Sequence, residues 1–168
     1  MSVIRNSRPF IVQVHVYNNY LSDNADVDSL EKEFAAYEDM SLKDYQISFN
    51  LTEYLDFSGS DEASYTSMMK VMAMAHDLDV LGGNTAFVNY YGVGEEDNTL
   101  FADLEETLPP AFFQYLKEQD RILYLSRTDE AGKVLGQYAA AIDVSDTRIV
   151  NKNCLLGTPC YLGIAVNT

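Results

Sequence analysis

The stretch Phe10-Ile-Val-Gln-Val-His-Val-Tyr17 decides the fold class of this chain, because it predicts a β-strand with one hydrophobic face. Every second residue of its first seven is apolar, which is the period of a half-buried strand. Polar turn residues follow the strand. Asp28, with Glu31 three residues later, then resembles a capping box and predicts a helix that extends to about Glu38.

The rest of the pattern predicts an α+β fold of short elements. Strands are expected over residues 45–51, 85–91, 121–126 and 161–166, and helices over 61–77, 99–107 and 111–119. Residues 134–142 fit either a strand or a helix, and residues 81–84, with two glycines, predict a turn. Small mixed α/β subdomains are expected at 1–60, 61–107 and 108–168, in an elongated chain, and the alternative is one compact domain.

The charge of the chain is large and unevenly distributed. The 168 residues include 26 acids and 11 bases, which gives a net charge of −15. Residues 21–107 contain 20 of the acids and three bases, whereas residues 108–168 contain six of each sign. Self-repulsion among so many carboxylates destabilises a compact state, so a fold that keeps them together is expected to use them. The alternative is that the charge has no special use, because the protein comes from an acidic proteome in which many protein surfaces are acidic.

Composition excludes several classes of function. A chain this acidic repels nucleic acids and anionic membranes. It contains no run of 18 apolar residues, and its first 19 residues lack the apolar stretch of a signal peptide, so we expect a cytoplasmic protein. Two cysteines, Cys154 and Cys160, are too few for a disulfide scaffold, and whether they pair is open.

Sequence motifs for catalysis and metal binding are absent. Neither His15 nor His76 has a second histidine at metal-ligand spacing. The acids between Asp23 and Asp28 do not fit the EF-hand loop, and there is no Walker loop or Gly-x-Ser-x-Gly motif. We therefore expect no enzyme activity, no cofactor and no metal, and leave open whether an acidic cluster binds a divalent cation.

Three stretches resemble the ArdA family of antirestriction proteins, which are encoded on plasmids and transposons. The first is the opening strand with its Tyr17-Asn18 end. The second, Asp44-Tyr45-Gln-Ile-Ser-Phe49-Asn-Leu-Thr-Glu53-Tyr54, is similar to a family segment with the same spacing. The third, Leu108-Pro-Pro-Ala-Phe-Phe-Gln-Tyr-Leu116, resembles a late Pro-x-x-Leu-x-x-Tyr-Ile element. Together they cover about a fifth of the chain, and the strand expected at 85–91 and the neutral last third depart from the family.

This resemblance implies a DNA mimic, an elongated and usually dimeric α/β protein that occupies the DNA-binding groove of type I restriction–modification enzymes. Carboxylates three or four residues apart on a helix lie ~5–6 Å apart and can present a row of charge. The acids expected to replace DNA phosphates are Asp23, Asp26, Asp28, Glu31, Glu38, Asp39, Asp44, Glu53, Asp56, Asp61, Glu62, Glu95, Glu96, Asp97, Asp103, Glu105 and Glu106.

Two other functions remain open at this point. One is inhibition of another nucleic-acid machine, such as a CRISPR effector. The other is a small phage-type enzyme that acts on a cationic cofactor such as S-adenosylmethionine, with Tyr54, Glu62 and Tyr65 as candidates. The charge-balanced segment 108–168 is expected to form the contact of a homodimer. The apolar residues expected in this contact are Phe112, Phe113, Tyr115 and Leu116. The alternative is that these four residues pack in the chain's own core.

Overall fold

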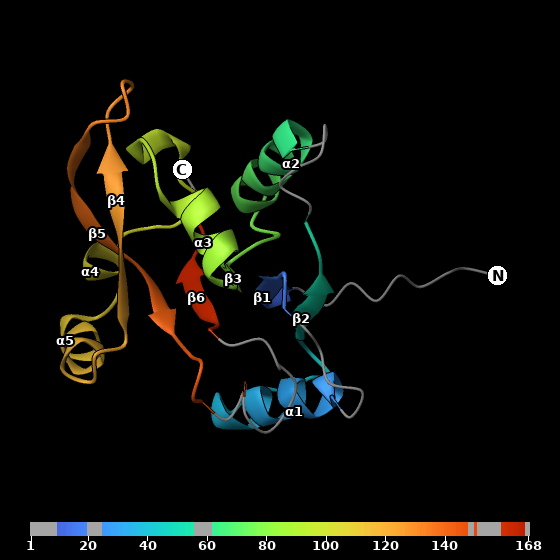
Figure 1. Cartoon of the computed structure of the whole chain (residues 1–168). Coiled ribbons are helices and arrows are strands. Elements are labelled where there is room, and N and C mark those ends of the chain that lie inside the picture. Colours follow the sequence, from blue (N-terminus) through green and yellow to red (C-terminus); the bar gives the residue numbers. More distant parts are fainter. Residues whose placement is uncertain (1–9, 20–24, 56–61, 148–149, 151–158, 167–168) are drawn as a thin grey trace.

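The computed structural model describes residues 10–19, 25–55, 62–147, 150 and 159–166 (Figure 1). Its elements in chain order are β1 (Phe10–Tyr17), α1 (Val27–Tyr37), β2 (Gln46–Glu53), α2 (Glu62–Met74), β3 (Val80–Gly83), α3 (Thr85–Gly92), the 3-10 helix η1 (Glu96–Asn98), α4 (Leu104–Thr107), α5 (Pro110–Glu118), β4 (Ile122–Thr128), β5 (Val134–Asp143) and β6 (Tyr161–Ile164). The opening strand and the helix that follows it are confirmed.

The six strands form one mixed sheet in the order β2-β1-β3-β6-β5-β4. β1 pairs in parallel with β2 and β3, and the pairs β3–β6, β6–β5 and β5–β4 are antiparallel. The fold class is therefore α+β, as the sequence predicts. Each of the three expected subdomains contributes strands to this one sheet, because β3 comes from the middle segment and β4 to β6 come from the last.

Helices cover both faces of the sheet. Val16 and Tyr17 are neighbours on β1, so their side chains point to opposite faces. Val16 packs in a cluster with Leu30 of α1, whereas Tyr17 packs with Met69 of α2 and Phe87 of α3. We call these two sides the α1 face and the α2 face.

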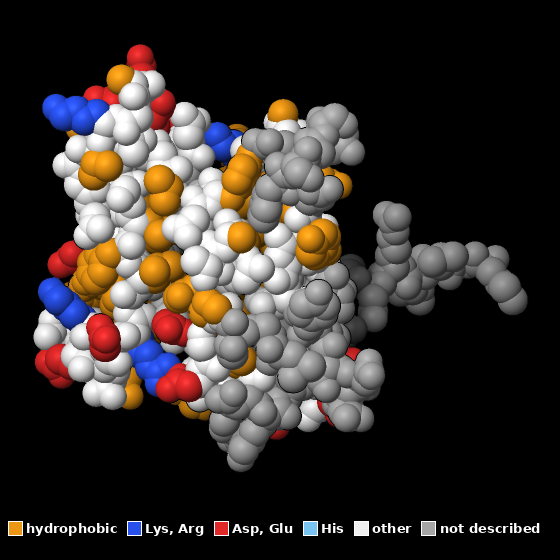
Figure 2. Space-filling view, viewed as in Figure 1, with side chains coloured by type: hydrophobic (Ala, Val, Ile, Leu, Met, Phe, Trp, Pro, Cys, Tyr) orange, Lys and Arg blue, Asp and Glu red, His pale blue; other side chains and the backbone are white. Residues whose placement is uncertain are grey.

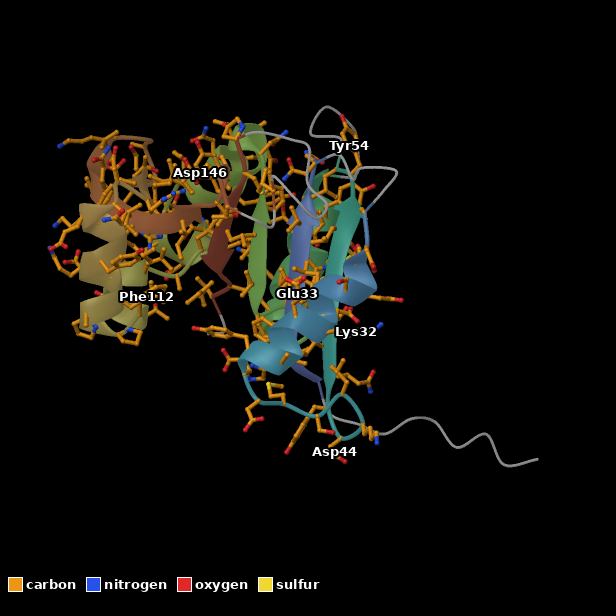
Figure 3. All side chains as sticks on the ribbon, turned by 90° about the horizontal axis from the view of Figure 1, so that it is seen from below. Lys32, Glu33, Asp44, Tyr54, Phe112 and Asp146 are labelled. Atoms are coloured by element: carbon orange, nitrogen blue, oxygen red, sulfur yellow. The ribbon has the colours of Figure 1, made fainter. Side chains whose placement is uncertain are left out.

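The short α4 and the helix α5 lie on the α1 face. Leu162 of β6 belongs to the α1 cluster, and Ile164, two residues later on the same side of the strand, packs with Leu104 of α4 and Phe113 of α5. Figure 3 views the molecule from the α1 face. On this face α1 lies toward the β2 edge of the sheet and α5 toward the β4 edge.

The chain changes face just before α4. Phe101 is fully buried in the α2-face core, and Leu104, three residues later, is fully buried on the α1 face. Gly163 makes room for this passage, because a Cβ there would lie 2.4 Å from Cδ1 of Phe101. The passage separates Glu95–Asp97, which precede it, from Glu105 and Glu106, which follow it.

Three sequence expectations are wrong. Residues 85–91 form the helix α3 instead of a strand, because the Asn84 side chain accepts a hydrogen bond from the Phe87 amide and caps the helix. Residues 81–83 belong to strand β3 instead of a turn. In the expected helix over 99–107, only Leu104–Thr107 is α-helical. The ambiguous residues 134–142 form β5.

Candidate functional site

A row of exposed carboxylates follows α1 and the turn after it. We define the acidic α1 surface as Asp28, Glu33, Glu38, Asp39 and Asp44, all of which are exposed. Two exposed bases lie beside these acids, Lys32 on α1 and Lys43 in the turn. Glu33 was not among the predicted acids, although its place between Glu31 and Glu38 in the expected helix could have identified it.

Several other predicted acids have local structural roles. Asp26 caps α1, since its carboxylate accepts a hydrogen bond from the Ser29 amide at 2.9 Å. Glu31 accepts from the Phe49 amide of the edge strand β2 at 3.4 Å. Asp103 caps α4, and Glu95 accepts a hydrogen bond from Asn98. These groups contribute negative charge, but their removal also weakens the fold.

The second group of predicted acids surrounds η1 and α4. We define the η1–α4 group as Glu95, Glu96, Asp97, Asp103, Glu105 and Glu106, of which four are exposed and two half-buried. A cavity of about 490 Å³ is lined by four of these carboxylates together with Arg127. The Arg127 guanidinium donates to the Thr99 hydroxyl at 2.5 Å and lies 3.6 Å above the Tyr138 ring, so the protein itself holds this base in place.

The two acidic groups lie almost a sheet's width apart. α1 contacts the edge strand β2, and α4 contacts β5, four strands away in the sheet order. Strands are spaced by about 4.8 Å, so the separation is about 19 Å. This is more than twice the Debye length of about 8 Å in physiological salt, and exposed charges at that distance are largely screened from each other.

One face of the molecule carries little charge at its centre. Figure 2 shows a face whose centre consists of hydrophobic and uncharged side chains, with most charged side chains toward its margins. The acids are therefore not spread evenly over the described surface. Asp23, Asp56 and Asp61, and the side chain of Glu62, lie outside the described part of the chain.

Glu53 belongs to a polar cluster at the carboxyl ends of β1 and β2. A register shift in the β1–β2 pairing between His15 and Tyr17 brings the Glu53 carboxylate to the same face as those residues. The carboxylate contacts His15 Nδ1 at 3.1 Å and accepts from Asn50 at 2.9 Å. Partial burial opposes its ionisation, but hydrogen bonds from His15 and its other neighbours outweigh this effect and lower its pKa.

Tyr17 completes this cluster beneath α3. Its ring stacks on Phe87 with centroids 4.8 Å apart, and only 1% of the residue is exposed. Burial, followed by the negative charge of Glu53, raises the pKa of Tyr17, so the hydroxyl stays protonated. Glu53 is thus bound within the protein and is a poor substitute for a solvent-exposed DNA phosphate.

The residues expected to mediate self-association divide into two pairs. Phe113 and Leu116 are only 5% and 7% exposed, so they pack in the chain's own core. Phe112 and Tyr115 are 46% and 56% exposed and remain available to a partner. The alternation follows from the helix: α5 turns one side toward the sheet and the other toward solvent.

The candidates for an enzyme do not form a pocket in the described structure. Tyr54 is 78% exposed at the end of β2, and Tyr65 packs against the core of the α2 face. Among the described residues no group of three or more acids, histidines or cysteines is arranged to hold a metal ion, and no helix is long and apolar enough to cross a membrane. Cys160 is buried, and Cys154 lies outside the described residues.

The fold and this surface define an α+β protein with helices on both faces of a mixed sheet and two acidic surface groups. No family model, curated protein or solved structure matches the chain. The interpretation of the site therefore rests on its own geometry.

Proposed function

We propose that this chain is a non-enzymatic binding protein that mimics DNA, and that its acidic α1 surface occupies the cationic DNA-binding surface of another protein. The resemblance to antirestriction proteins makes a type I restriction–modification enzyme the first partner to test. Such a partner acts in the cytoplasm. A CRISPR effector presents the same kind of surface and is the second partner to test.

The concentration of exposed carboxylates on α1 and the turn after it is the observation that supports this proposal. The helix has 11 residues, so it is about 16 Å long. One strand of B-DNA carries one phosphate charge per 3.4 Å of axis, or about five over that length. Two of the five carboxylates of the acidic α1 surface lie on this helix and three follow it, and Lys32 and Lys43 reduce its net charge to −3, so the surface presents part of the charge of one DNA strand.

Binding of this kind depends on many weak contacts. An exposed ion pair contributes only about 0.2–1 kcal/mol, so no single carboxylate is expected to be essential. Opposite surface charges also increase the rate of association, as they do for DNA itself. An enzyme differs in this respect, since one substitution of a catalytic group can abolish its activity while the fold survives.

A competition assay tests the proposal. Labelled duplex DNA is bound to a purified type I restriction–modification enzyme, and the full-length chain is titrated in at 50 and 200 mM salt. We expect the chain to displace DNA and to lose affinity at the higher salt concentration. Failure to displace DNA at either concentration, from this enzyme and from a CRISPR effector, contradicts the proposal.

A further inference from the structure

No helix of the described residues covers the middle of the α1 face between α1 and α5, where Val150 packs in the α1 cluster. Six strands span about 24 Å from β2 to β4, and packed helices lie 8–10 Å apart, so three helices fit side by side on such a face. In the described part of the chain, α1 lies toward β2, and α5 with the short α4 lies toward β5 and β4. Figure 3 shows α1 and α5 with the middle strands between them.

An apolar groove of about 440 Å³ opens beside α1. Val12, Val80 and Leu162 of the middle strands line its floor, and Leu30 and Phe34 of α1 line its wall. All of these except Leu30 are only half-buried, so hydrophobic area stays in contact with water. Burying apolar area stabilises a contact by roughly 25 cal/mol per Å², which makes this groove a favourable place for another apolar surface.

The α5 side of the gap is also hollowed. A second hollow of about 220 Å³ is lined by Tyr115 and Leu116 of α5 and by Ile142 and Val144. Val144 packs in the same cluster as Leu30 of α1, which links the two hollows across the sheet. An elongated occupant between the two helices can therefore contact both.

Both sides of the gap are negative. Glu33 lines the groove on the α1 side, whereas Lys32 does not. On the other side, Arg121 forms an ion pair with Asp146, and the acids Asp120 and Asp143 line the same surface. An occupant with an apolar face and basic flanks matches this arrangement of charges.

We propose that the gap between α1 and α5 binds a basic amphipathic helix of the partner protein. The helix lies with apolar residues at positions i, i+3, i+4 and i+7 in the groove, and its lysines or arginines face the acidic α1 surface. This inference deepens the proposed function and rests on it, since it names the element of the cationic partner that α1 contacts.

The absence of tryptophan from the chain allows a direct test. Tyr37 lines the groove and is 86% exposed, so Tyr37→Trp places the one tryptophan of the chain, which can be excited selectively, at the proposed site. Tyr54→Trp is the matched control, since Tyr54 is 78% exposed and does not line the groove. The probe is a synthetic Leu/Lys peptide of about 14 residues with helical apolar spacing and no aromatic residue.

We expect this peptide to shift the emission of Tyr37→Trp to shorter wavelength in a saturable way and to leave Tyr54→Trp unchanged. A peptide of the same composition in scrambled order should bind at least tenfold more weakly. Circular dichroism of both variants confirms that they are folded.

Each other outcome has a distinct meaning. If the scrambled peptide binds as tightly as the helical one and neither shifts the emission of Tyr37→Trp, the groove is not the binding site. The acidic surface then still binds basic peptides, and the proposed function stands. Equal binding of a Leu/Glu peptide overturns the requirement for a basic helix and also counts against the proposed function. No shift with any peptide overturns the inference, while the DNA competition assay decides the proposed function separately.

Discussion

Neutralising the acidic α1 surface should weaken partner binding much more than an equal change of charge elsewhere. The test variant combines Asp28→Asn, Glu38→Gln, Asp39→Asn and Asp44→Asn, which removes four exposed carboxylates and keeps the size of each side chain. Asp26 and Glu31 are left unchanged, because their hydrogen bonds to backbone amides stabilise α1 and β2. The variant should therefore unfold close to the wild-type temperature.

The expected size follows from the exposure of these groups. At about 0.2–1 kcal/mol for each exposed ion pair, four together contribute about 1–4 kcal/mol. This corresponds to a loss of affinity between about fivefold and several hundredfold, whereas a single substitution should cost no more than about fivefold. Five carboxylate contacts also imply that the wild type loses about 10²- to 10³-fold in affinity between 50 and 200 mM salt.

The matched control is a quadruple substitution in the η1–α4 group. Glu96→Gln, Asp97→Asn, Glu105→Gln and Glu106→Gln change the net charge by the same amount at exposed positions. Because that group is about 19 Å from α1 across the sheet, we expect only a small effect. Displacement of DNA from the restriction enzyme at two salt concentrations is the assay. Equal losses in both quadruple variants would show that overall charge, and not the α1 surface, determines binding.

Three further predictions concern packing, pH and self-association. Gly163→Ala should destabilise the fold by at least about 1–3 kcal/mol in urea denaturation, because its Cβ would lie 2.4 Å from Phe101 Cδ1 and 2.7 Å from a carbonyl oxygen. Gly136→Ala, with no atom within 4 Å of its Cβ, should be nearly neutral. Burial raises the pKa of Cys160 from 9.0 to about 11, so the folded state holds the thiol proton more tightly than the unfolded state does. The free energy of unfolding that this thiol contributes should therefore fall as the pH rises from 9 to 11. Cys160→Ala should flatten that part of the curve of urea midpoint against pH, and an unchanged slope would exclude this cause. Light scattering at tens of micromolar should show a dimer that Phe112→Asp dissociates, and a monomeric wild type would reject self-association through α5.

Local patterns predicted most of the fold where one face of an element is buried. β1 alternates strictly, and α1 has both a capping residue and apolar residues at helical spacing, so each was identified close to its observed bounds. α3 was missed because its Phe, Val and Tyr residues suggested a strand, although Asn84 in front of it is a good N-cap.

The short strand β3 shows a limit of turn propensity. Two glycines suggested a turn, yet both lie where neighbouring segments of the same chain approach β3 closely. A Cβ at Gly82 would lie 2.1 Å from the Tyr161 carbonyl oxygen, and one at Gly83 would lie 2.5 Å from that of Tyr17. Such contacts arise from strands distant in sequence, so no local pattern reveals them.

Composition predicted that the acids would be exposed, but their arrangement required the fold. Asp28 was expected to cap the first helix and Asp103 to lie inside a longer one, whereas the capping residues are Asp26 and Asp103. The position of Glu53 beside His15 was not readable, because it depends on a register shift between β1 and β2. The groove beside α1 was not readable either, since its floor comes from strands far apart in the chain.

The fold also changes what the charge of the acidic segment means for a partner. Counted along the sequence, residues 21–107 carry 20 acids and three bases. In the structure, the passage from Phe101 to Leu104 places the later acids near β5, about 19 Å from those on α1 and beyond the range of screened electrostatics. A partner at α1 meets five exposed carboxylates together with Lys32 and Lys43, a net charge of about −3, and the salt dependence of binding should reflect that smaller charge. A surface of this size covers only part of a long cationic groove, and it suits a helix-sized basic element there. For this reason the charge of α1 and the apolar groove beside it are best understood as two parts of one binding surface.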